Sequence, residues 1–341
     1  MWRSRSSPRW READLYLTDA TALARDWVAE HAPHTAAYLG GSATWLAPGQ
    51  RLPPTSDLDL FLVPEHGTGP RTGKFRHRGT LLEVTALDRA LLADPAAVLA
   101  DYHLAPALRR DTVLADPAGW LRPLQRAVAA DFAAETWVRR RCADAEARLR
   151  DRLARAAEPG PWPWRVTWWL FGTGISTHVL LTAGLRNPTV RRRYSATREL
   201  LPAGQQEELL AALGCAHLTP DRVRTHLATM TRLFDEAGPA AEGSGLPFAS
   251  DLSPAARAVA VDGTAAQIEA GEHREAVFWL VATCARALLA LRRDDDPGFA
   301  ELLADLGQTG PADLRAQIGR TRSFLPRLAE IREEVLVRTL A

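Results

Sequence analysis

The spacing of apolar residues changes character along the chain. Up to about residue 120, patterns typical of helices and of strands alternate. Residues 17–32 carry apolar side chains at helical spacing. Short strands are expected at 35–40 and 57–63, followed by a hairpin of 73–79 and 80–87. Residues 92–120 are expected to form helices joined by turns. The first third of the chain is therefore predicted to hold a small mixed sheet with covering helices.

Beyond residue 120 the strand patterns almost vanish, and Asp116-Pro117-Ala118-Gly119 is a natural boundary between the two kinds of pattern. We predict an α+β protein with a mixed-sheet domain over residues 1–120 and a larger all-helical domain over 121–341. The expected helices cover 124–157, 166–185, 189–201, 204–213, 220–236, 254–270, 272–293, 298–306 and 311–340.

Two aspartates interrupt the apolar strand 57–63. Side chains at i and i+2 of a strand point to the same face, so Asp57 and Asp59 project together while Leu58 and Leu60 pack behind them. Two adjacent carboxylates repel each other unless a cation lies between them, and Mg²⁺ is a hard ion that takes oxygen ligands. Glu83, a single acid within strand 80–87, is a third candidate ligand. The alternative is an acidic edge strand, with Glu83 facing solvent.

A Gly-Gly-Ser sequence precedes these acids. Gly40 and Gly41 allow a tight turn and a close approach of the backbone to a ligand. Ser42 is expected to open a short helix whose free N–H groups favour a phosphate. Together, the turn and the acids predict a phosphate cradle that faces a metal site.

The Gly-Gly-Ser turn, the pair Asp57 and Asp59, and Glu83 follow one another within about residues 38–87. In this order they resemble the motif of the nucleotidyltransferase domain of the DNA polymerase β superfamily. The small-molecule branch of that superfamily, typified by aminoglycoside and kanamycin nucleotidyltransferases, also pairs such a domain with a helical one. The resemblance implies transfer of a nucleotide, with AMP from ATP the expected case, to a hydroxyl of a small molecule such as an antibiotic or a biosynthetic intermediate. Pyrophosphate would be released.

The resemblance also implies roles for individual residues. Two Mg²⁺ ions would be bound by Asp57 and Asp59, with Glu83 on the ion nearer the acceptor. Gly41 and Ser42 would hold the β- and γ-phosphates, with Gly40 completing the turn.

Three arginines are a further candidate for contact with the triphosphate. Arg191, Arg192 and Arg193 follow an Asn-Pro sequence that is expected to start a helix. Cations in a first turn oppose the helix dipole, which indicates an anionic partner. Pairing with acids such as Glu199 is the alternative.

Other polar and aromatic clusters are ambiguous. The cluster of Lys74, Arg76, His77 and Arg78 is expected to be a solvated hairpin, with contact to triphosphate or a charged acceptor as the alternative. Four tryptophans are expected to pack a helix interface, an aromatic platform being the alternative; they are Trp162, Trp164, Trp168 and Trp169. No general base is assigned among Glu199, Glu272 and Glu275.

Charge, cysteine content and hydropathy bear on the class of acceptor and on the location of the protein in the cell. The net charge of +1 gives no global basic field, so a nucleic-acid acceptor is less expected. Cys142, Cys215 and Cys284 have no metal or disulfide spacing and are expected to be buried thiols in a reducing compartment. No apolar stretch follows the first arginines, and 166–185 is too polar for a confident membrane span. We therefore expect a cytoplasmic protein without a membrane partner, and a homodimer stays possible.

Two other functions are compatible with these patterns. One is a nucleotidyltransferase that acts on tRNA or on a protein, as a toxin does. The other is a non-catalytic module that binds a nucleotide or a partner.

Overall fold

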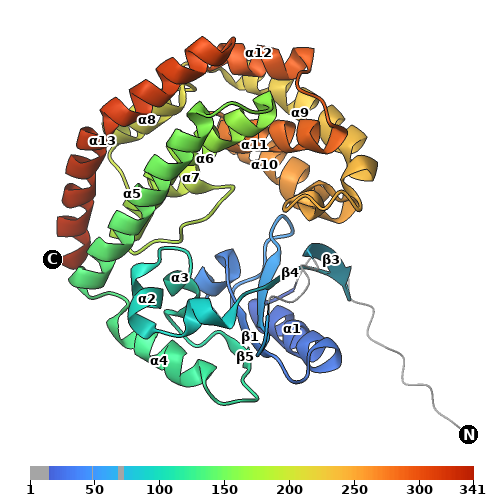
Figure 1. Ribbon diagram of the computed structural model, residues 1–341, viewed down its shortest axis with the longest axis vertical. Coiled ribbons are helices and arrows are strands. Elements are labelled where there is room, and N and C mark those ends of the chain that lie inside the picture. Colours follow the sequence, from blue (N-terminus) through green and yellow to red (C-terminus); the bar gives the residue numbers. More distant parts are fainter. Residues whose placement is uncertain (1–14, 48, 68–72) are drawn as a thin grey trace, which may run out of the picture.

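The computed structural model describes residues 15–47, 49–67 and 73–341. The expectation about a signal peptide falls on residues 1–14, which lie outside the described residues. A mixed sheet with short helices occupies the lower part of Figure 1, and helices α5 to α13 form an arch above it. The predicted α+β class, with a sheet region followed by a larger helical region, is confirmed.

The sheet has five strands in the order β3-β4-β2-β1-β5. Strands β2 and β4 are parallel, and the other neighbours are antiparallel. Arg78 and Gly79, both at positive φ, form the two-residue turn between β3 and β4, a geometry that suits the twist of a hairpin. The strands are β1 (Ala36–Leu39), β2 (Leu58–Val63), β3 (Gly73–His77), β4 (Thr80–Ala86) and β5 (Val113–Ala115).

Strand β5 was not predicted, because residues 92–120 were expected to form only helices and turns. Its pairing places Tyr38 opposite Val113 and Ala37 opposite Ala115. Three residues are too few to show an alternating pattern, so the pairing with β1 rather than the local sequence defines this strand.

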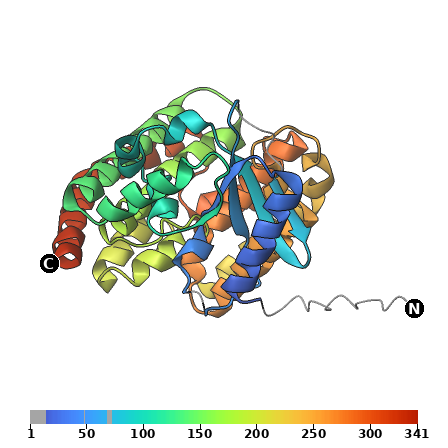
Figure 2. The same ribbon diagram turned by 90° about the horizontal axis from the view of Figure 1, so that it is seen from below.

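The two faces of the sheet are covered differently. Helix α1 (Leu17–His31) packs on the face that carries Leu58, Leu60 and Leu82, and it crosses the sheet in Figure 2. The opposite face, which carries Tyr38 and Val63, is covered by three short helices. They are α2 (Pro95–Ala100), α3 (Ala105–Leu108) and α4 (Leu121–Asp131).

The expected long helix 124–157 is two helices. The chain bends after α4 and continues as α5 (Glu135–Ala157), which packs on α6. Arg141 holds the bend, since its buried guanidinium donates to the carbonyl oxygens of Leu99 and Phe132. Because α4 packs against the sheet, the apolar core of the first region continues past residue 120. The boundary after residue 120 stays a prediction.

The rest of the chain is helical. The uncharged segment at 166–185 lies in α6 (Trp162–Ala183), a buried helix as expected, and all three cysteines are buried. Across the described residues no helix combines the length and apolar character needed to cross a membrane. The other α-helices are α7 (Arg193–Arg198), α8 (Ala203–Leu213), α9 (Pro220–Ala241), α10 (Gly263–Glu269), α11 (His273–Leu291), α12 (Pro297–Asp305) and α13 (Pro311–Leu340).

Short non-α segments complete the description. A π-helix, Ala258–Asp262, precedes α10. The 3₁₀ helices are η1 (Ser42–Trp45), η2 (Arg89–Leu92), η3 (Ala249–Leu252) and η4 (Pro254–Ala256). Both η3 and η4 contact β3, which joins the helical region to the sheet.

Candidate metal and phosphate site

Three carboxylates meet on the sheet face opposite α1. The parallel register of β2 and β4 sets Asp59 directly beside Glu83, and Asp57 immediately precedes β2. One oxygen from each of the three lies within 4.8 Å of the others. Leu58 and Leu60 are fully buried on the other face, as the strand period predicts. The structure thus brings together the three acids that the sequence singled out.

The ammonium group of Lys74 lies among these acids. Lys74 stands opposite Glu83 on β3; its Nζ is 2.8 Å from Oδ2 of Asp57 and also contacts the Glu83 carboxylate. Only 7% of its side chain is exposed. The expectation of a solvated hairpin was wrong for Lys74, although Arg76 and Arg78 are exposed. The register of the hairpin, which sequence alone did not fix, turns this lysine inward.

A fourth carboxylate comes from the helical region. Asp251 in η3 lies 3.0 Å from Nζ of Lys74 through Oδ1, and its Oδ2 accepts a hydrogen bond of 2.8 Å from Nη1 of Arg286. Gly73, at the start of β3, leaves no room for a Cβ, which would come within 2.5 Å of Ser250. This close approach of β3 to η3 is what brings Asp251 to the site. Its sequence context, a loop rich in Gly and Pro, gave no signal of it.

The charges of this cluster shift one another. Burial and the neighbouring Asp57 and Glu83 carboxylates raise the pKa of Asp59 well above its usual range. Burial would lower the pKa of Lys74, but the surrounding carboxylates, Asp251 and Asp57 foremost, raise it well above its usual value. Burial would raise the pKa of Asp251, but Lys74 and Arg286 outweigh it and lower that pKa. The carboxylates and the Lys74 ammonium thus act on one another through their charges.

The Gly-Gly-Ser turn presses against the acids. Gly41 has φ +60°, and a Cβ there would lie 1.6 Å from Oδ2 of Asp59. The N–H of Gly40 donates to the Asp59 carbonyl oxygen over 3.0 Å, and a Cβ on Gly40 would meet the ring of Phe61. Ser42 begins the four-residue η1. Glycine at position 41 is thus required both by its backbone conformation and by the carboxylate beside it.

The three arginines after residue 190 do not share a helix turn as expected. Helix α7 begins only at Arg193, and the side chain of Arg191, which precedes it, bonds to other parts of the chain. Its Nη1 donates to the Gly263 carbonyl oxygen over 2.9 Å, and its Nη2 donates to that of Thr55 over 3.4 Å. The side chain of Arg191 thereby contacts the loop that leads into Asp57.

Arg192 is exposed and pairs with Glu272 over 3.5 Å. Arg193 is buried within the helical region, away from Arg191. Of the three, Arg191 is the one that the structure brings beside the acids. Burial and Arg192 lower its pKa to about 10, and Asp57 acts in the opposite sense.

The carboxylates considered as general bases lie elsewhere. Glu272 accepts a hydrogen bond of 2.6 Å from Ser195, buried Glu275 lies 3.8 Å from Arg198, and Glu199 is exposed at the end of α7. In the part of the chain that the structure describes, none of the three forms an ion pair or hydrogen bond with the acidic cluster. Asp251 is the carboxylate of the helical region that reaches it.

The tryptophans pack a helix interface, as expected. Trp169 is fully buried, and Trp162, Trp164 and Trp168 pack partly buried against the helical core. Trp164 and Trp168 stack with ring centroids 6.1 Å apart.

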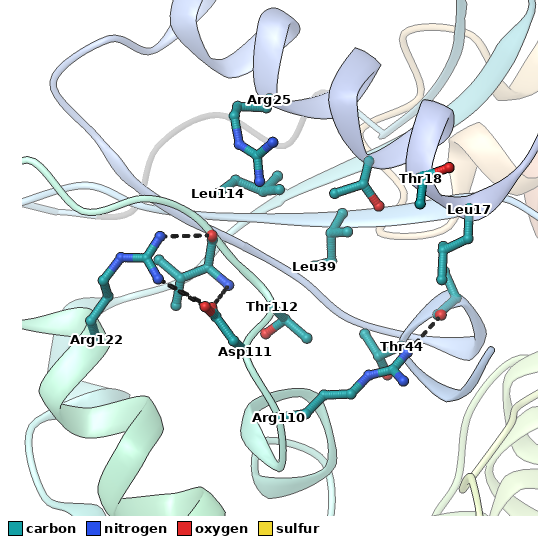
Figure 3. A pocket seen from close by; sticks show the side chains of 13 residues that line it. Leu17, Thr18, Arg25, Leu39, Thr44, Arg110, Asp111, Thr112, Leu114 and Arg122 are labelled. Carbon is teal, nitrogen blue, oxygen red and sulfur yellow. Dashed lines mark hydrogen bonds and ion pairs between the residues drawn. The ribbon is translucent and has the colours of Figure 1, made fainter. Parts of the chain in front are cut away.

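A hollow of about 440 Å³ lies at the other edge of the sheet, near β1 and β5. Figure 3 shows Arg122 turned toward Asp111, with which it forms an ion pair of 3.0 Å. Arg110 donates to the Leu46 carbonyl oxygen over 2.7 Å. Arg110, Asp111 and Arg122 thus have partners within the chain, and none of the residues that line this hollow belongs to the acidic cluster.

Comparisons with protein-family models, with curated proteins and with solved structures gave no match. The case for a ligand therefore depends on the site itself. Carboxylate oxygens from Asp57, Asp59 and Glu83 are the donors that Mg²⁺ takes, and two of these acids, Asp57 and Glu83, also contact the ammonium of Lys74. The donor set fits Mg²⁺.

Proposed function

We propose that this chain is a magnesium-dependent nucleotidyltransferase of the DNA polymerase β superfamily that modifies a hydroxyl group of a small molecule. The observation that carries the proposal is the convergence of Asp57, Asp59 and Glu83 beside the tight Gly41 turn. Three acids on, or directly before, two adjacent strands and a glycine turn pressed on one of them are what a metal-bound triphosphate requires.

Each residue has a part in this proposal. Asp57, Asp59 and Glu83 would hold two Mg²⁺ ions, which when bound stabilise charge on the attacking and leaving oxygens. The turn of Gly40, Gly41 and Ser42 would approach the β- and γ-phosphates of ATP. Arg191, fixed beside Thr55, would offer the phosphates a further charge.

Asp251 is proposed as the general base. Its carboxylate, which the helical region brings within 3.0 Å of the Lys74 ammonium, would accept the proton of the acceptor hydroxyl. The hydroxyl oxygen then forms a bond to the α-phosphorus, and the bond between that phosphorus and pyrophosphate breaks. Asp251 replaces the three glutamates considered from the sequence.

The first prediction tests this activity directly. Pyrophosphate release is measured with Mg²⁺, each of the four nucleoside triphosphates and a panel of hydroxyl acceptors, including aminoglycosides, lincosamides and sugar phosphates. Asp59→Asn is expected to lower turnover at least about a thousandfold, since it removes a ligand charge from the metal centre. Glu65→Gln, which changes an exposed acid just beyond β2, should retain full turnover. Normal turnover in Asp59→Asn would refute the proposal.

One observation favours a second candidate, a non-catalytic nucleotide-binding module. Lys74 already supplies a positive charge to the acids, so the site has a built-in counter-ion. This candidate predicts binding of nucleotide without Mg²⁺ and without pyrophosphate release. Calorimetric titration of ATP with and without Mg²⁺ separates the two, and a tRNA or protein acceptor becomes the next test if binding is Mg²⁺-dependent but every small acceptor is inert.

A further inference from the structure

Three arginine side chains surround one phenylalanine in the helical region. The guanidinium carbons of Arg152, Arg193 and Arg286 lie 5.7, 5.4 and 5.4 Å from the centroid of the Phe171 ring. They come from α5, from the start of α7 and from α11, so the fold rather than the local sequence assembles them. Three cations around one ring repel one another, which calls for a counter-charge.

Two of these arginines have no such counter-charge within the chain. Across the described residues, neither Arg152 nor Arg193 forms an ion pair with a carboxylate, and only Arg286 does, with Asp251. Arg193 is 1% exposed, yet its buried Nη1 has no hydrogen-bond partner. A buried guanidinium nitrogen left without an acceptor is costly, and a bound anion would satisfy it.

Gly174 and Phe278 pack closely on the guanidinium of Arg193. Gly174 packs so close that a Cβ would come 2.7 Å from Nη1 of Arg193, and the Phe278 ring supports its guanidinium at 3.8 Å. Burial and the mutual repulsion with Arg152 and Arg286 contribute to lowering the pKa of Arg193 to about 9. Arg152 and Phe171 remain partly exposed, so solvent reaches this edge of the cluster.

The cluster lies next to the acceptor side of the proposed site. Arg286 binds Asp251, Asp251 binds Lys74, and Lys74 binds Glu83. Asp251 is the residue that the proposed function sets beside the acceptor hydroxyl, whereas Arg191 bonds to Thr55, two residues before Asp57, where the triphosphate is expected. The arginines are thus separate from the nucleotide cradle.

We propose that the acceptor carries an anionic group, a phosphate or a carboxylate, that is bound by Arg152, Arg193 and Arg286. This inference rests on the proposed function and narrows its substrate class. A polycationic aminoglycoside would be repelled by these side chains, whereas a hydroxylated phosphate or carboxylate compound would be held with its hydroxyl toward Asp251.

The test uses the full chain with Mg²⁺ and a non-hydrolysable ATP analogue that fills the donor site. Binding of inorganic phosphate, glucose 6-phosphate, glucuronate, glucose and glucosamine is measured by calorimetry. We expect inorganic phosphate and at least one anionic sugar to bind, and glucose and glucosamine not to bind. The comparison of glucose 6-phosphate with glucuronate tells a phosphate site from a carboxylate site.

Variants on α5 provide the control. Arg152→Gln should weaken anion binding by about tenfold to a hundredfold, the loss of a charge-assisted hydrogen bond. Arg152→Lys should restore part of it. Arg155→Gln should have no effect, because Arg155 contacts the same Trp168 ring as Arg152 but pairs with Asp151 instead. The unfolding temperature of each variant checks that it is folded.

Any of three binding results would overturn the inference: no anion binds, Arg152→Gln binds anions as the unchanged protein does, or the ATP analogue displaces the anion. Pyrophosphate release with amine-rich acceptors in place of anionic ones would also overturn it while leaving the proposed function intact. Anion binding that depends on Arg152, without pyrophosphate release from any nucleotide, would keep the arginine site and refute the transferase.

Discussion

At the scale of single residues, Lys74 has the most unusual surroundings in the site. It is the only lysine among the 42 lysine and arginine residues of the sequence, and its ammonium contacts carboxylates from two regions of the chain. In the absence of metal it balances acids that would otherwise repel one another. A divalent ion must compete with it for the same oxygens.

Lys74→Met should therefore destabilise the metal-free protein and strengthen its response to Mg²⁺. Breaking a buried charge cluster costs about 3–5 kcal/mol, which should appear as a lower unfolding temperature. Added Mg²⁺ should then raise that temperature by more than it does in the unchanged protein. Arg76→Met, two residues along β3 and exposed, is the control. An equal Mg²⁺ response in both proteins would show that Lys74 does not compete with the ion.

Gly41 allows a second test at this scale, with Gly79 as a matched control. Both glycines have positive φ, but only Gly41 has an atom within 4 Å of an added Cβ, namely the Asp59 carboxylate oxygen. Gly79→Ala should cost only about 1–2 kcal/mol of backbone strain. Gly41→Ala should cost more, and displacement of Asp59 should lower turnover by about a hundredfold. Urea unfolding and pyrophosphate release measure the two effects, and equal behaviour of the variants would contradict the assigned clash.

At the scale of elements, the sequence predicted what depends on local pattern. The two strands with inward acids, the hairpin and the buried helix α6 all follow from spacing and composition. The predictions that were wrong concern features that depend on contacts between segments distant in the sequence. Strand β5 exists through pairing with β1, and the side chain of Arg191 is placed by hydrogen bonds to Gly263 and Thr55, which are distant in the sequence.

The same difference between local pattern and distant contacts separates the site residues that the sequence predicted from those that it missed. Asp57, Asp59 and Glu83 stood out because an acid in an apolar strand is visible in the sequence. Asp251 did not stand out, because its place beside Lys74 is set by the packing of η3 on β3. Lys74 was read as solvated because its sequence neighbours are charged, whereas the sheet register decides which way it points.

Helix α6 leads to a prediction about pH. His178 is buried within it, and burial and Arg193 lower its pKa well below the usual value. Below about pH 6.5 the unfolded chain binds a proton there that the folded chain does not, so stability is lost as pH falls. The contribution is at most about 1.4 kcal/mol per pH unit.

Urea unfolding of the unchanged protein and of His178→Gln between pH 7 and 5 checks this point. Glutamine does not titrate and retains an N–H donor for the Thr189 carbonyl oxygen, which Nε2 of His178 approaches to 2.9 Å. The difference in stability between the two proteins should shrink or reverse in favour of the variant as pH falls. Parallel pH dependences would mean that His178 takes up its proton while folded.

At the scale of the whole molecule, one chain of charged groups joins the two regions. Glu83 and Lys74 belong to the sheet, and Asp251 and Arg286 belong to the helical region. Beyond Arg286 lie the arginines around Phe171. The metal site and the proposed anion site are therefore linked through Asp251, which contacts a cation of each.

The single lysine also has a chemical consequence. Every other basic side chain of this protein is arginine or histidine, so amine-directed reagents have one side-chain target in the entire sequence. That target is enclosed between β3 and η3, with 7% of its side chain exposed. Acylation or reductive methylation of the native protein at this position thus requires the two regions to part, and the rate of labelling reports how often they do.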